Sequence, residues 1–147
     1  MQTGASGRGR EDWPNLHMKI AAGLYHPHMD KLGIEILRRD DGVTVLRLSG
    51  SAGIAEEATM SRPLNGLAAA RPQRLIVDLS GLDFIASLAI GQIVSVVRAT
   101  TSHGGAAAIA SPDANIRQAL LRCGLDRLVP VCASLDEAEQ AVAGATP

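Results

Sequence analysis

The sequence predicts an α/β domain with a mixed, mostly parallel sheet of four to five strands, an N-terminal β-hairpin and about four helices. Three observations predict this fold class. Short apolar strand patterns alternate with helical ones along most of the chain. The run Leu75-Ile76-Val77 is continuously apolar, as in a strand that is buried on both faces. Asp41-Gly42 stands between two apolar runs, which is a hairpin signal.

Residues 1–30 are expected to form a mobile N-terminal extension, and residues 31–147 a single domain. The opening stretch MQTGASGRGRED is polar and rich in glycine, so it cannot bury enough apolar surface to become ordered. The residues that follow have no clear hydrophobic period, apart from a short docked piece expected around Leu24 and Tyr25.

The first regular elements form a hairpin and a helix. Apolar residues over 34–36 and 43–48 predict two short strands, and Gly50 to Gly53 is expected to end the second one. A helix is expected over residues 54–70, with Pro63 kinking or restarting it.

Apolar residues at helical spacing predict a second helix from Ser87 to about Thr100, followed by a short strand over 106–110. Ser111-Pro112-Asp113 should open a third helix with Ser111 as its N-cap. Gly124 stands where that helix should end.

The last two elements are a strand and a helix. Leu128 and Val129, together with Val131, predict the strand. Ser134 followed three residues later by Glu137 forms a capping box, which predicts the start of the helix.

Charge and composition exclude several classes of protein. Fourteen basic residues against fifteen acidic ones give a formal net charge of −1, which offers no electrostatic basis for binding nucleic acid. There is no apolar core of a signal peptide, and no run approaches the roughly 20 apolar residues that span a bilayer. We therefore expect a cytoplasmic protein without membrane insertion. Cys123 and Cys132 suit a reducing compartment and are expected to be buried as small apolar side chains.

Motifs of catalysis and of metal or cofactor binding are missing from the sequence. It contains no GxSxG elbow, no phosphate-binding loop and no HExxH spacing. His26 and His28 lack the further ligands that a metal site needs. The acids Asp78, Asp83, Asp113 and Asp126 stand near the ends of predicted elements, where they are best explained as caps or turn residues. We expect no catalytic residues, no metal and no cofactor.

The segment from Arg74 to Arg98 carries the most information. It reads as an apolar strand, then Asp78-Leu79-Ser80, then a short loop containing Phe84, then Ser87 at the start of a helix. This arrangement resembles the STAS domain family, whose best-known members are the bacterial anti-sigma factor antagonists. The resemblance covers about residues 33–143 and includes the order of the elements. It implies a regulatory protein-binding module and not an enzyme.

The resemblance also implies a site and a partner. The partner would be an anti-sigma factor that is a histidine-kinase-like serine kinase, or another regulatory protein, and Ser87 would be the serine that it phosphorylates. An added anion is tolerated at the start of a helix, where backbone N–H groups are free. Otherwise Ser87 is only an N-cap that contributes roughly 1 kcal/mol to the helix. The partner-binding residues would be Gly53, Ile54, Phe84, Ala86, Ser87, Leu88 and Gly91.

Two departures from the family pattern leave a second interpretation open. Ala86 and Leu88-Ala89 replace the Asp and the Ser-Gly that usually flank the serine, and Gly50 to Gly53 lacks the acid of the family loop. The chain is therefore either an antagonist switched at Ser87 or a STAS adaptor subunit of a transporter or signalling scaffold that is not phosphorylated.

Overall fold

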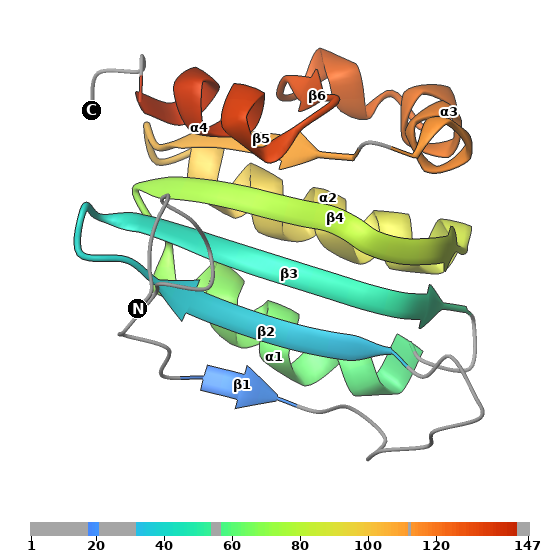
Figure 1. Cartoon of the computed structure of the whole chain (residues 1–147). Helices are drawn as coiled ribbons and strands as arrows, with labels where there is room; N and C mark the ends of the chain where they lie inside the picture. The colour runs from blue at the N-terminus through green and yellow to red at the C-terminus, as the bar shows by residue number, and fades with distance from the viewer. Residues whose placement is uncertain (1–17, 21–31, 54–56, 112, 144–147) are drawn as a thin grey trace, which may run out of the picture.

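Strands and helices alternate along the chain after an initial pair of antiparallel strand contacts (Figure 1). The computed structural model describes residues 18–20, 32–53, 57–111 and 113–143. The elements are β1 (Met18–Ile20), β2 (Gly33–Arg38), β3 (Val43–Ala52), α1 (Glu57–Ala70), β4 (Arg74–Ile85), α2 (Ser87–Thr101), β5 (Ala106–Ala110), α3 (Ala114–Arg122), a 3₁₀ turn (Leu125–Arg127), β6 (Val131–Cys132) and α4 (Leu135–Ala143).

The strands of the sheet lie in chain order, from β1 at one edge to β6 at the other. β1, β2 and β3 pair in antiparallel fashion, whereas β3, β4, β5 and β6 are parallel to one another. The predicted α/β class and hairpin are confirmed. Short β1 lies within the segment expected to be an extension and pairs with β2; the rest of that segment, with Leu24 and Tyr25, falls outside the described residues.

Two apolar layers cover the two faces of the sheet. The larger one joins the sheet to α1, α2 and α3, with buried residues that include Ile34, Leu46, Leu64, Val77, Ile93, Ile109 and Leu120. The smaller one joins the opposite face to α4 through Leu37, Val43, Val45, Ile76, Ala108, Ala110, Ala138 and Val142. The alternation of Ile76 and Val77 between the two layers explains why the β4 sequence is continuously apolar.

β3 and β4 both extend further than the sequence predicts. β3 continues through Gly50 to Ala52, because Gly50 adopts a φ of +82° at an irregularity in the register and pairing with β4 then resumes. β4 continues to Ile85, so Phe84 lies on the strand and not in a loop. Backbone pairing with the neighbouring strand outweighs the turn-forming residues in both segments.

The third helix begins differently from the prediction. Asp113, and not Ser111, is the N-cap of α3, and its carboxylate accepts hydrogen bonds from the backbone N–H groups of Asn115 and Ile116. Ser111 is fully buried just beyond β5. Gly124 follows the C-cap with a φ of +81°, as a helix-ending glycine should.

Two expectations near the C-terminus are wrong. Leu128 and Val129 precede β6 and do not belong to it, because the chain first makes a 3₁₀ turn. The cysteines are not buried: Cys123 is exposed at the end of α3, beyond its apolar stripe, and Cys132 is half-buried on the edge strand β6. Burial raises the pKa of Cys132 most, and the nearby charge of Glu137 raises it further.

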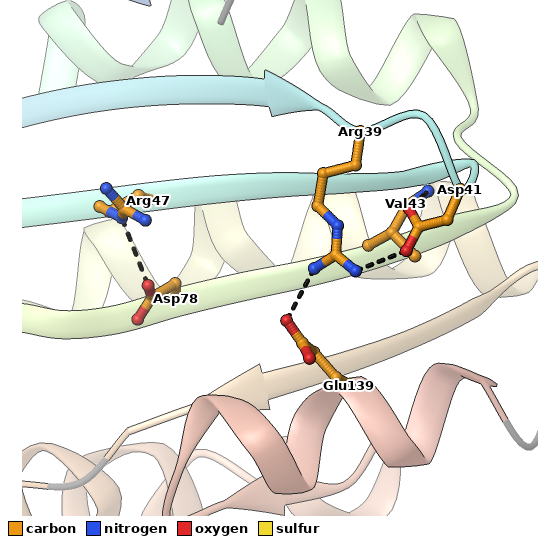
Figure 2. A network of polar contacts seen from close by, with 6 residues as sticks. All are labelled: Arg39, Asp41, Val43, Arg47, Asp78 and Glu139. Atoms are coloured by element: carbon orange, nitrogen blue, oxygen red, sulfur yellow. Dashed lines mark hydrogen bonds and ion pairs between the residues drawn. The ribbon is translucent and has the colours of Figure 1, made fainter. Parts of the chain in front are cut away.

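Two contacts anchor α4: the hydrogen bond at its N-cap and an ion pair made by Glu139. The predicted capping box is present in part: Ser134 Oγ accepts from the N–H of Glu137 at 3.2 Å. One turn further along, Glu139 binds the Arg39 guanidinium at 2.7 Å. Arg39 also binds Asp41 at the hairpin, so one side chain connects the β2–β3 turn to α4 (Figure 2).

The contact with Arg39 helps to lower the pKa of Asp41. Burial raises the pKa of Asp41, but the hydrogen bond from Arg39, the N–H of Val43 and the positive charge of Arg39 together outweigh burial. The net pKa therefore lies below the ordinary value of 3.8. A carboxylate with a lowered pKa stabilises the fold above its unfolded-state pKa, and this contribution is lost as the pH falls through the folded-state pKa.

We predict that Asp41→Asn lowers the free energy of unfolding at neutral pH by less than about 1 kcal/mol, because exposed ion pairs contribute little. Asparagine keeps an acceptor for the Val43 N–H and removes only the charge. In urea unfolding at decreasing pH, the gap between wild type and variant should close below pH 3.8. A gap of constant size into strong acid would contradict a role for the Asp41 charge.

Candidate functional site

The end of β4 places the candidate site at one edge of the sheet. β5 ends opposite Asp78, so beyond Asp78 the strand β4 pairs only with β3. β4 ends at Ile85, and the backbone N–H of Ala86 then binds the carbonyl of Ala52 at 2.8 Å. α2 starts at the next residue, so the end of β3 fixes the position of Ser87.

Ser87 is the first residue of α2 and is exposed. The N-cap is Ala86, whose methyl group cannot accept a hydrogen bond from the first turn, so the interpretation of Ser87 as an N-cap is wrong. The Ser87 hydroxyl makes no hydrogen bond with any residue that the structure describes. The first turn of α2 contains no acidic residue. The hydroxyl is therefore available, at a point where backbone N–H groups favour an added anion.

Two large, exposed apolar residues lie near Ser87 in the chain. Phe84 at the end of β4 and Leu88 in the first turn of α2 are each 52% exposed. In the described part of the chain, Leu121 on α3 is the one other large hydrophobic residue that is exposed. A scattered exposed leucine is ordinary, but two such residues within three positions of one exposed serine distinguish this segment.

Gly91 lies one helical turn beyond Ser87 and is also exposed. A Cβ atom built on Gly91 would meet nothing within 4 Å, so the packing of this chain does not require a glycine there. The missing side chain leaves the α2 backbone open to close approach from outside. We call Phe84, Ser87, Leu88 and Gly91 the Ser87 surface.

The remaining predicted partner-binding residues lie beside this surface or outside the described residues. Ala86 is half-buried between Phe84 and Ser87 in the chain. Gly53 directly follows β3, whose last residue pairs with Ile85. Ile54 falls outside the described residues. The sequence predicts these residues as a binding site, whereas the extended β4 and the position of Ala86 as N-cap depend on pairing with β3.

Asp78, which the sequence suggested to be a cap or turn residue, has a different role. It is fully buried in β4, where its carboxylate accepts a hydrogen bond from Arg47 Nε at 3.3 Å (Figure 2). The same carboxylate accepts from the backbone N–H of Ser80 at 3.0 Å. Arg47 also binds Glu35 at 3.1 Å, so the three charges cross three adjacent strands. This network joins neighbouring strands and is not part of the Ser87 surface.

The described residues offer no metal site and no membrane span. No group of three or more His, Cys, Asp or Glu among them is placed to hold a metal ion. None of the helices described is long and apolar enough to cross a bilayer. His26 and His28 lie outside the described residues. What the described site offers is an accessible hydroxyl in an apolar surround, which suits the binding of another macromolecule.

Comparison with known proteins gives the same fold. A curated relative from Thermotoga neapolitana, named as an anti-sigma factor antagonist, is 31% identical over 48% of this chain and 63% of its own length. The match thus spans about three fifths of that relative. An anti-sigma factor antagonist from Mycobacterium paratuberculosis superposes with a TM-score of 0.70 at 23% identity, covering 82% of this chain and 99% of that one. Phosphorylated SpoIIAA from Bacillus gives a TM-score of 0.56 at 17% identity over 73% and 96%.

At these identities the solved structures establish the fold alone. The family model for the STAS domain, however, matches residues 34–138, which is well over half of the chain and extends from β2 into the first half of α4. The chain therefore belongs to the STAS domain family.

Proposed function

We propose that this chain is a regulatory protein-binding module that acts as an anti-sigma factor antagonist and sequesters an anti-sigma factor through the Ser87 surface. The observation that carries this proposal is the exposed Ser87 hydroxyl between two half-exposed apolar side chains at the start of α2. The named relatives suggest the class of partner. The module acts in the cytoplasm by binding, without catalytic residues or a cofactor of its own.

Apolar burial provides the affinity in this proposal. Fully burying a leucine or phenylalanine side chain contributes about 1.5–3 kcal/mol, and Phe84 and Leu88 still expose half of their surface. Gly91 allows the partner to reach the α2 backbone beside them. The partner surface that fits is apolar, with a polar group for the Ser87 hydroxyl.

Phosphorylation of Ser87 would release the partner. The kinase transfers the γ-phosphoryl group of ATP to Ser87 Oγ, which loses its proton, and ADP leaves. The product carries close to two negative charges between Phe84 and Leu88. Burying that dianion against an apolar partner carries a large desolvation penalty, whereas the exposed start of α2 tolerates it. With Ala86 beside the serine, desolvation contributes more to release than repulsion from a neighbouring carboxylate.

Ala86 also favours a second candidate function, that of an adaptor without a phosphorylation cycle. Ala86 stands where the family usually has an acid, and Gly50 to Gly53 lacks another. A chain with both changes could serve as a STAS adaptor subunit of a transporter or signalling scaffold. Its apolar surface would bind a partner with no phosphorylation cycle.

If phosphorylation of Ser87 releases the partner, the chain should carry one phosphorylation site. Incubation with ATP and the histidine-kinase-like serine kinase encoded nearest to its gene should add a single phosphoryl group, measured by intact mass. Ser87→Ala should accept none, because it lacks the hydroxyl. Full phosphorylation of Ser87→Ala would overturn the proposed site. If the wild type stays unmodified and Ser87→Asp binds the partner normally, the adaptor function is favoured.

The apolar surface predicts a second result. Leu88→Ser should weaken binding to the same anti-sigma factor about three- to tenfold by calorimetry, since burying the exposed half of a leucine is worth about half of the 1.5–3 kcal/mol of full burial. Leu121→Ser is a matched control, because Leu121 is 43% exposed on α3, outside the Ser87 surface. Its affinity should equal that of the wild type. Equal losses at both positions, or no loss at Leu88, would refute this use of the surface.

A further inference from the structure

A pocket of about 480 Å³ lies far from the Ser87 surface, between the β2–β3 hairpin, the start of β4 and α4. Val43 and Ala143 supply apolar lining. Its charged and polar lining residues are Arg39, Asp41, Arg74, Asp136, Glu139 and Gln140. The volume is within the range of small-molecule sites, roughly 300–1,000 Å³.

One part of this pocket is fixed by internal contacts. Arg39 spans from the hairpin to α4 by binding both Asp41 and Glu139, as Figure 2 shows. Asp41 also accepts the N–H of Val43 at 3.2 Å. The Arg39 side chain is only 18% exposed. These groups therefore form a preformed wall and are already satisfied.

The other polar side chains of the pocket are available. Arg74, Asp136 and Gln140 form no side-chain hydrogen bond or ion pair with any residue in the described part of the chain. Arg74 stands at the first residue of β4, and Asp136 in the first turn of α4. A cation and a carboxylate from two different elements thus line one pocket without a partner in the described chain.

The charges define the chemistry of a ligand. Two arginines against three carboxylates give the lining a net charge of −1, which disfavours a multiply charged anion such as a nucleotide. A single carboxylate matches the planar guanidinium of Arg74. An ammonium group matches Asp136, and a second cationic group balances the net charge.

We propose that this pocket is a binding site for a free basic amino acid, with its carboxylate on Arg74 and an ammonium group on Asp136. Arg74 and Ile85 are the two ends of the twelve-residue β4, roughly 35 Å apart, so the pocket and the Ser87 surface lie at opposite ends of this strand. The site is therefore separate from the proposed partner surface and does not depend on it.

Titration of the full ¹⁵N-labelled chain with L-lysine tests this site. Saturable shifts are expected at the amides of the β2–β3 turn, Arg74 and α4 from Asp136 onward. Arg74→Gln and Asp136→Asn should each weaken L-lysine at least tenfold. Arg98→Gln, which removes an exposed arginine on α2, should bind like the wild type.

Ligands that carry only one kind of charged group of L-lysine, here called half-ligands, complete the test. Acetate supplies only the carboxylate and cadaverine only the ammonium groups, so each should bind at least tenfold more weakly than L-lysine. The proposal is overturned by the absence of saturable shifts at millimolar L-lysine, by Arg74→Gln binding normally in a folded chain, or by half-ligands that equal L-lysine. None of these results would alter the proposed role of Ser87.

Discussion

The burial of β4 on both of its faces sets the layout of the whole sheet. Along its first half, β4 is hydrogen-bonded to β3 and β5, with Val77 packed in the layer of α1 to α3 and Ile76 in the layer of α4. Even its one charged interior residue, Asp78, is fully buried and held by Arg47 of β3. Removing one partner from a buried pair leaves an uncompensated charge, so this contact also fixes the pairing of the two strands.

The same strand positions the surface that is proposed to bind a partner. Because β4 extends beyond β5 while still paired with β3, it carries Phe84 and Ser87 to an exposed edge. The bond from Ala86 to Ala52 then fixes the first turn of α2. A rigid strand end and helix start can present a serine and two apolar side chains with little conformational entropy left to lose on binding. At the other end of β4, Arg74 faces the pocket beside α4, so one strand connects two distinct surfaces.

The sequence predicts the elements whose signals are local. The Asp41-Gly42 hairpin, the Ser134–Glu137 cap and the boundaries of β5 and α2 agree with the structure to within a residue or two. The largest errors arise where pairing with residues distant in sequence sets the structure, although the cap of α3 and the turn before β6 are local errors. Pairing with a neighbouring strand carries β3 and β4 through turn-like residues, and the Arg47–Asp78 contact joins residues 31 positions apart. The Ser87 surface was predicted from a family resemblance, but its exposure and the unbonded hydroxyl follow only from tertiary packing.

On the proposed function, a protein partner binds at the Ser87 surface. Amide hydrogen exchange of the chain, free and bound to its anti-sigma factor, measures where the partner covers the backbone. New protection should be confined to the end of β4 and the first two turns of α2, from Phe84 to about Val94, and should be lost when Ser87 carries phosphate. Protection centred instead on α3 or on the β2 edge, with the start of α2 unchanged, would contradict it.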